Sequence, residues 1–178
     1  MPIESPVGPL YTVDEVRAEL RASGFADLER RYAHPAMIVM GPAEDFGPST
    51  WTRAFESTEP PAMMLPPLLV SLAPRGLTGM RVSFGRMAPC DVVLPFRQLS
   101  RVHVHFIRTA DGWQVEDVGS RNGTILDGKQ IEPNVPVALR SGAKLRFGDV
   151  IAHFMVAAAL QDYLRRESRP FTPMPRPY

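Results

Sequence analysis

Arginine, serine and asparagine side chains recur between residues 86 and 122, on segments separated by turn signals. Arg86 follows a short apolar run, Ser100 lies in a later loop, and Asn122 lies between glycines at positions 119 and 123. A guanidinium can donate two parallel hydrogen bonds to the oxygens of one phosphate group, and a hydroxyl or amide can add single donors. Glycines permit loop conformations that other residues avoid. The spacing therefore predicts a loop-built binding site for an oxyanion.

The charge distribution favours the same chemistry. The formal net charge is only +1, but residues 1–60 hold ten acids against five arginines, whereas residues 75–121 hold seven arginines, no lysine and four acids. Planar, fork-shaped arginine donors suit oxyanion recognition, and an unevenly charged, solvated surface is the alternative interpretation. The isoelectric point near 8.0 and the lack of a basic stripe with interleaved aromatic residues argue against a nucleic-acid binder.

The elements that must position these residues have the pattern of strands. From Leu68 onward, short apolar runs alternate with turn signals about every eight to twelve residues, which is typical of an all-β sandwich or barrel. Asp111-Gly112 and Asp127-Gly128 each separate two such runs and predict type I′ hairpin turns with positive φ at both central residues. Gly148-Asp149 marks a final hairpin. The predicted fold is mainly β and antiparallel.

The rest of the chain has a different character. Thr12 and Glu15 form a capping-box pattern, followed by apolar residues at helical spacing, so a helix is predicted there. Nineteen prolines gather mostly toward the two ends, where a loop or an unstructured tail is expected. The predicted organisation is a helical segment (1–40) in which residues 37–40 are a candidate short strand, a Pro-rich linker (41–67), a β domain (68–156), a C-terminal helix (157–168) and a disordered Pro-rich tail (169–178).

Several short motifs in this order resemble the signature of forkhead-associated (FHA) domains. They are Gly85-Arg86, residues 91–94, residues 100–103 and residues 117–124, followed by Gly148-Asp149 in the place expected late in that pattern. The resemblance covers about half of the chain and leaves residues 1–65 unexplained. It implies an FHA-type antiparallel β-sandwich, flanked here by short N-terminal helices and a C-terminal helix. It also implies binding of phosphothreonine on a partner protein.

The resemblance assigns roles residue by residue. Arg86 and Ser100 would hold the phosphate, Asn122 would bond the peptide backbone, and Arg121 would face the phosphate unless it is only a solvated turn residue. Arg101 is included among the phosphopeptide-binding residues, although the family varies at its position. Gln98 and Gly123 would influence which residue is accepted a few places after the phosphothreonine. Structural roles are assigned to Gly85, His103 and Gly119.

The function predicted from these motifs is a phosphothreonine-dependent protein-binding adaptor in Ser/Thr kinase signalling. A phosphate-independent protein-interaction module is the alternative. An enzymatic alternative is a hydrolase built from Ser100, His103 and Asp117, but Ser100 lacks the Gly-x-Ser-x-Gly surroundings that expose a nucleophile. We therefore expect no catalytic residues.

Partners and location follow from what the sequence lacks. With one cysteine, Cys90, no disulfide framework or cysteine-based zinc site is expected, and we expect no metal or cofactor. The chain opens without a signal-peptide pattern and holds no apolar run of spanning length, which predicts a cytoplasmic protein without a membrane or nucleic-acid partner. The expected partner is a phosphothreonine-containing protein, either a Ser/Thr kinase or its substrate. Phosphorylation of Thr50, Thr52 or Thr58 in the linker would let the domain bind its own chain or a second copy.

Overall fold

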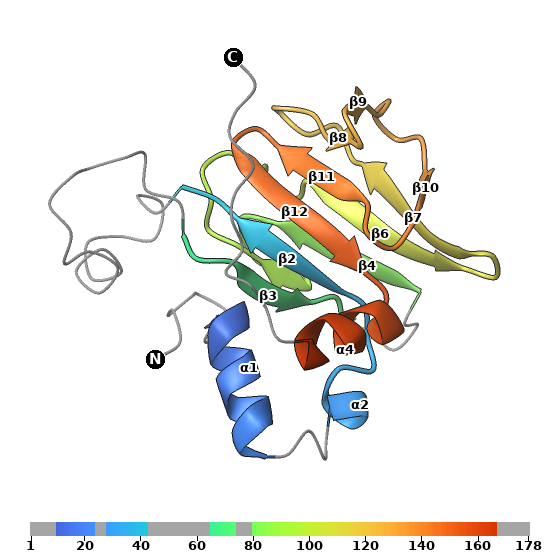
Figure 1. Cartoon of the computed structure of the whole chain (residues 1–178). Helices are drawn as coiled ribbons and strands as arrows, with labels where there is room; N and C mark the ends of the chain where they lie inside the picture. Colours follow the sequence, from blue (N-terminus) through green and yellow to red (C-terminus); the bar gives the residue numbers. More distant parts are fainter. Residues whose placement is uncertain (1–9, 24–27, 43–64, 74–79, 167–178) are drawn as a thin grey trace, which may run out of the picture.

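The structure is a computed structural model that describes residues 10–23, 28–42, 65–73 and 80–166. Two β-sheets lie face to face, and three helices gather beside one of them (Figure 1). The predicted fold class, a β-sandwich with short N-terminal helices and a C-terminal helix, is confirmed. No helix in the described ranges has both the length and the apolar character needed to cross a membrane.

The larger sheet has seven strands. Their order across the sheet is β1, β3, β2, β12, β11, β8 and β9, and every neighbouring pair is antiparallel. The strand bounds are β1 Tyr11–Thr12, β2 Ala36–Met40, β3 Leu68–Ser71, β8 Ile125–Leu126, β9 Lys129–Gln130, β11 Lys144–Phe147 and β12 Val150–Met155.

The smaller sheet has five strands in the order β10, β7, β6, β4 and β5. Their bounds are β4 Arg81–Gly85, β5 Val92–Val93, β6 Val104–Thr109, β7 Gly112–Asp117 and β10 Val137–Leu139. Strands β4 and β5 pair in parallel, and the other pairs are antiparallel. Because β5 continues in the direction of β4, the chain crosses back between them through residues 86–91, and this crossing forms one of the site loops.

The main core lies between the two sheets. Strands that are buried on one side only alternate buried and less buried residues, as β6 and β12 do. Four phenylalanines fill the centre: Phe84 lies 5.3 Å from Phe147 between ring centroids, and Phe106 lies 6.3 Å from Phe154. Their burial fixes the distance between the sheets and therefore the positions of the loops that leave them.

The helices cover the outer face of the larger sheet. Helix α1 (Val13–Ala22) begins at the predicted capping box, with the Thr12 hydroxyl and the Glu15 carboxylate each bonded to the other residue's backbone N–H. Helices α2 (Leu28–Arg31) and α4 (Ala157–Arg165) complete the layer. A second apolar cluster lies beneath them: Val13, Val16, Leu20, Leu28, Ala36, Ile38, Leu69, Leu160 and Leu164.

The sandwich begins earlier in the chain than the predicted boundary at Leu68. Strand β2 lies between β3 and β12 in the middle of the larger sheet, inside the range predicted as a helical segment, and it includes the candidate short strand at residues 37–40. All five β2 residues are buried, because Met37 and Val39 face the main core while Ala36 and Ile38 face the helices. A strand covered on both faces has no alternating pattern, so sequence periodicity gives it little signal.

One of the two predicted type I′ turns is confirmed. Asp127 and Gly128 have φ values of 49° and 87°, both positive, between β8 and β9. At the β6–β7 hairpin the prediction was wrong by one residue. Thr109 pairs with Gly112, so Ala110 and Asp111 form the turn, and Gly112, with φ of 133°, begins β7. The glycine supplies a backbone conformation at the first strand position instead of inside the loop.

Candidate functional site

Three loops meet at the end of the sandwich where β4, β5 and β7 end. Backbone bonds join the first two: the Arg86 N–H donates to the Ser100 carbonyl at 2.9 Å, and the Met87 N–H donates to the Arg101 carbonyl at 3.4 Å. The third loop joins them through the Arg121 N–H, which donates to the Ser100 hydroxyl oxygen at 2.9 Å. Ser100 is therefore the point where the three loops connect.

The Arg86 side chain lies partly buried at this junction and has no hydrogen-bond partner among the described residues. Its Nε is completely buried. A buried donor without an acceptor costs about 1–3 kcal/mol, so the arrangement favours an anionic ligand that would satisfy the guanidinium. The Ser100 hydroxyl accepts one hydrogen bond, and its own proton has no acceptor in the described part of the chain. Both groups are thus available to the same ligand.

His103 holds two of the loops from beneath. Its ring is fully buried and packs edge-on against Phe147, with 5.0 Å between ring centroids. Nδ1 accepts the Ser100 N–H at 3.0 Å, which leaves the proton on Nε2 to donate to the Gly123 carbonyl at 3.3 Å. Burial lowers the pKa of His103, although the Gly123 carbonyl and the Asp117 carboxylate oppose this shift. The neutral ring therefore fixes Ser100 relative to the third loop.

Asp117 organises the third loop from its first residue. The carboxylate is almost fully buried, and Oδ1 accepts the N–H groups of Gly119 and Ser120 at 2.9 and 2.7 Å. Oδ2 accepts the hydroxyls of Ser120 and Thr124 at 2.7 and 2.6 Å. Burial alone would raise the pKa of Asp117, but these donors outweigh it and the pKa is lowered. Sequence reasoning missed this role, although an aspartate followed by glycine and serine is a known local turn pattern.

The two glycines that were assigned structural roles, Gly85 and Gly119, are required for different reasons. A Cβ at Gly85 would lie 2.2 Å from the Arg101 carbonyl oxygen, so any side chain would push the first two loops apart. Gly119 has φ of 80° and open space around it, so it is needed for its backbone conformation. Gly123 has φ of 69° and supplies the carbonyl that binds His103. Its predicted part in specificity stays a prediction.

Asn122 is exposed at the tip of the third loop and is held by Gln98. Its Nδ2 donates to the Gln98 carbonyl at 2.8 Å and to the Gln98 Oε1 at 3.2 Å. The Gln98 Nε2 donates in turn to the Asp149 carboxylate at 3.1 Å, in the turn between β11 and β12. The structure therefore brings Asn122 and Gln98 together, as predicted residues of one site, and adds Asp149, which was predicted only as part of a hairpin turn and of the FHA-like pattern.

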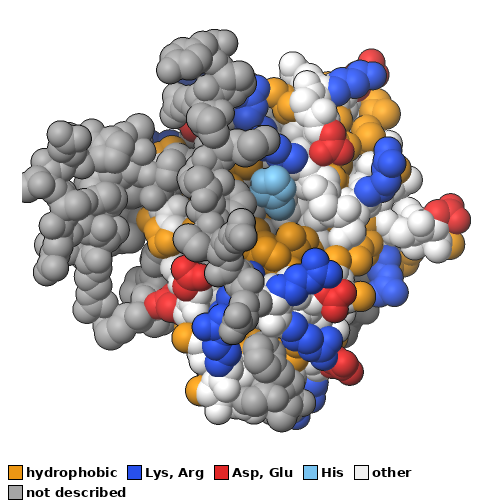
Figure 2. All heavy atoms as spheres, viewed as in Figure 1, with side chains coloured by type: hydrophobic (Ala, Val, Ile, Leu, Met, Phe, Trp, Pro, Cys, Tyr) orange, Lys and Arg blue, Asp and Glu red, His pale blue; other side chains and the backbone are white. Residues whose placement is uncertain are grey.

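The remaining predicted residues lie at the rim. The side chains of Arg101 and Arg121 are exposed and form no hydrogen bond or ion pair within the described residues, although their backbones bond the other loops. Over the viewed face, Lys and Arg side chains form separate groups among acidic and hydrophobic ones rather than one stripe (Figure 2).

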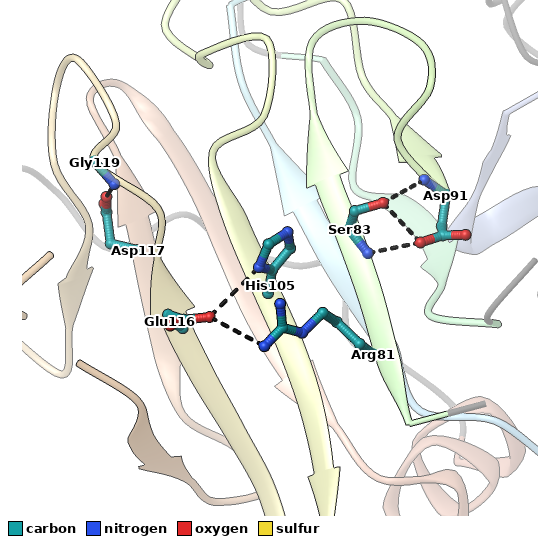
Figure 3. A network of polar contacts seen from close by, with 7 residues as sticks. All are labelled: Arg81, Ser83, Asp91, His105, Glu116, Asp117 and Gly119. Atoms are coloured by element: carbon teal, nitrogen blue, oxygen red, sulfur yellow. Dashed lines mark hydrogen bonds and ion pairs between the residues drawn. The ribbon is translucent and has the colours of Figure 1, made fainter. Parts of the chain in front are cut away.

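A second polar network lies on the smaller sheet, beside the site but separate from it (Figure 3). Glu116 forms an ion pair with Arg81 at 3.7 Å, and its carboxylate lies 3.4 Å from His105 Nδ1 on the neighbouring strand. Ser83 and Asp91 exchange three hydrogen bonds of 2.7 to 2.9 Å. The Ser83–Asp91 contacts close the loop of residues 86–90 at its base and so restrict where Arg86 can lie.

Fold and geometry define a class: a β-sandwich domain whose loops at one end bring together the Ser100 hydroxyl and an Arg86 side chain that has no partner in the described residues. The FHA domain family model matches residues 82–148, which include β4 to β11 and all three site loops. The chain therefore contains an FHA domain.

Solved structures similar to the chain include FHA domains. The FHA domain of CT664 from Chlamydia trachomatis has a TM-score of 0.48 and 20% identity over 68% of this chain and 95% of that one. The N-terminal FHA domain of Saccharomyces cerevisiae Rad53p, solved with a phosphothreonine peptide, has a TM-score of 0.46 and 18% identity, with 73% and 98% covered. The structure of Rad53 residues 1–466 with AMP-PNP has a TM-score of 0.47 and 19% identity over 73% of this chain. The match spans only 32% of that chain. The comparison with curated proteins gave no match.

Proposed function

We propose that this protein binds phosphothreonine on a partner protein and works as an adaptor in Ser/Thr kinase signalling in the cytoplasm. The observation that carries the proposal is the Arg86 guanidinium, buried at Nε and without a partner in the described residues, beside the Ser100 hydroxyl. The phosphothreonine peptide bound by the Rad53p FHA domain supports the choice of ligand.

The chemistry of the ligand fits the donors. A phosphothreonine carries roughly −1.5 to −2 charges and three strong acceptor oxygens near neutral pH. The Arg86 fork can bind two of these oxygens and the Ser100 hydroxyl a third. FHA domains are among the domains that recognise phosphorylated residues through arginine side chains. Arg101 and Arg121, exposed beside Ser100, add positive potential that favours the approach of an anion.

Binding is favoured over catalysis because the three hydrolase candidates do not form a triad. His103 Nδ1 accepts the backbone N–H of Ser100 and not its hydroxyl, and Nε2 faces the Gly123 carbonyl. The Asp117 oxygens accept from Gly119, Ser120 and Thr124. A serine nucleophile needs a base within hydrogen-bond reach of its hydroxyl and a third group that orients the base. The same residues here hold loops together.

Calorimetry with matched peptides tests the proposal. We expect the threonine-phosphorylated peptide to bind, the serine-phosphorylated one to bind more weakly, and the unmodified one not to bind measurably. Arg86→Ala removes two charge-assisted hydrogen bonds worth about 1.5–3 kcal/mol each, so affinity should fall by at least about 100-fold. Arg108→Ala is the matched control, because Arg108 is an exposed arginine near the far end of β6.

Equal binding of all three peptides, or full affinity in Arg86→Ala, would contradict the proposal. A pull-down that survives phosphatase treatment would instead favour a phosphate-independent interaction module. The linker threonines Thr50, Thr52 and Thr58 lie outside the described residues, and self-binding through them stays a prediction.

A further inference from the structure

A continuous chain of side-chain hydrogen bonds leads from the candidate peptide site to an acidic group. Asn122 donates to Gln98 Oε1 at 3.2 Å, and Gln98 Nε2 donates to Asp149 at 3.1 Å. Both ends of the Gln98 amide are used, so its orientation is fixed. A Cβ on Gly148 would lie only 2.6 Å from Gln98 Oε1, which shows how closely this side chain lies over the β11–β12 turn. Asp149 is therefore held at a defined place beside Asn122.

The charge of Asp149 is not neutralised by an ion pair within the described part of the chain. The residue is exposed, and no Lys or Arg of the described residues forms an ion pair with it. Two other acidic residues in this part of the domain, unlike Asp149, have partners that stabilise their charge. Glu116 lies against Arg81, and Asp117 is buried among neutral donors. Asp149 thus places a free negative charge next to a loop cluster that otherwise carries exposed arginines.

A negative charge beside an anion-binding site weakens the binding of every phosphorylated peptide unless the ligand brings a cation to it. Such an arrangement favours one class of ligand and rejects another, which is how charged groups commonly create specificity. An acidic side chain placed against Asp149 is repelled, and a lysine or arginine there is attracted.

We propose that Asp149, oriented by Gln98, is a specificity-determining residue that selects phosphorylated segments with a basic side chain close to the phosphothreonine. The proposal rests on the proposed function, because it concerns the sequence around the same phosphorylated residue. It names the ligand class as a phosphothreonine segment that carries a lysine or arginine and lacks an acid at the position that meets Asp149.

Asp149 also has a local role that must be separated from its charge. It lies in a tight turn and accepts a hydrogen bond from Gln98, and an aspartate is common in turns for such reasons. Asp149→Asn keeps an oxygen acceptor for Gln98 and removes only the charge, whereas Asp149→Lys reverses the charge. A structural role predicts equal behaviour toward all peptides, while a charge role predicts a change that depends on the peptide.

The test uses the full chain and a set of phosphothreonine peptides in which one residue at a time, from three before to four after the phosphothreonine, is Lys, Ala or Glu. At one position we expect Lys to bind about 3- to 10-fold more tightly than Glu at low salt, the range of exposed charge pairs. In Asp149→Asn this ratio should fall toward one, and in Asp149→Lys it should invert. Asp111→Asn, the same change at the far β6–β7 turn, should leave the ratio unaltered.

The outcomes separate the two proposals. If phosphorylated and unmodified peptides bind alike, or none binds, the proposed function fails and this inference fails with it. If phosphorylation is required but no position distinguishes Lys from Glu, only the role of Asp149 is wrong. A Lys preference that persists in Asp149→Asn overturns the assignment to this residue.

Discussion

The loop site and the helical layer each contain an arginine whose Nε is buried without a hydrogen-bond partner, but the two guanidinium groups are otherwise in opposite situations. On helix α1, Arg17 is 5% exposed, and its Nη2 donates to the Tyr163 carbonyl at 2.9 Å. Its guanidinium carbon lies 4.3 Å from the centre of the Tyr163 ring. The Arg86 guanidinium has no such partner in the described residues.

The difference separates a structural arginine from a binding one. A cation over an aromatic face, with one strong hydrogen bond, is largely satisfied by the protein itself. Arg17 therefore joins helix α1 to helix α4, beside the apolar cluster that lies between the helices and the larger sheet. Around Arg86 the backbone groups are bonded while the charged end is left open. A buried Nε alone does not indicate a ligand site; the state of the rest of the guanidinium does.

Asp117→Ala is expected to have the largest effect on the domain and to act on the loop site. Four donors lose their acceptor, and each buried unsatisfied donor costs about 1–3 kcal/mol before relaxation. We expect unfolding free energy to fall by about 3 kcal/mol or more, together with phosphopeptide affinity, because the third loop loses its shape. Chemical denaturation and calorimetry measure the two effects.

Asp117→Asn sharpens this result by keeping the size of the side chain. The amide offers one oxygen in place of two, so part of the network survives and a smaller loss is expected. The lowered pKa of Asp117 means that its contribution is present above the unfolded value, near 3.8, and is lost as pH falls through the folded pKa. An acid-induced loss of stability that is identical in the wild type and Asp117→Asn would contradict this account.

Arg17→Ala is the corresponding change in the helical layer and should separate stability from binding. It removes the contact with Tyr163 and the packing of a long buried side chain, so unfolding free energy should fall by about 2 kcal/mol. Phosphopeptide affinity should stay within about twofold of the wild type, since the site loops belong to the other end of the sandwich. Chemical denaturation measures the change in stability, and calorimetry measures the affinity for the phosphopeptide.

Arg17→Met is the control, because it retains most of the apolar stem and should recover part of the stability. If Arg17→Ala, shown to be folded, lost phosphopeptide binding, the two regions would be coupled and the comparison would fail.

The β-sandwich could be predicted from the sequence because short apolar runs alternate with turn signals, and this fold is confirmed. Arg86, Ser100 and Asn122 were chosen because they lie near turns and in motifs that resemble those of FHA domains, and their part in binding stays a prediction. Strand β2 lies inside the range assigned to a helical segment. Residues 37–40 were a candidate short strand, but burial on both faces leaves no alternation that would place them in the middle of a sheet. A contact such as that between Gln98 and Asp149, 51 residues apart in sequence, depends on strand register. Neither Gln98 nor Asp149 indicates this contact from its own place in the sequence.

The pH dependence of stability gives the smallest expected effect and tests whether His103 is kept neutral. Because burial lowers its pKa in the folded state, the unfolded chain binds a proton first as pH falls below the ordinary value of 6.5. The stabilising contribution of the neutral ring is therefore present above pH 6.5 and is lost as pH falls toward the folded pKa, with a slope of at most about 1.4 kcal/mol per pH unit.

A protonated ring would also place an N–H against the Ser100 N–H, so the bond between His103 and Ser100 is lost with the charge change, whereas Nε2 still donates to the Gly123 carbonyl of the third loop. We expect wild-type unfolding free energy to fall between pH 7 and 5.5, with a contribution from His103 of at most about 1 kcal/mol. His103→Gln, which cannot be protonated, should show a smaller fall, and the fall that is left includes His153, whose pKa is also lowered by burial. Stability is the correct measurement, because the phosphate of a ligand titrates near pH 6 and would obscure an affinity profile. A flat wild-type profile, or the same step in His103→Gln, would show that His103 is not the group responsible.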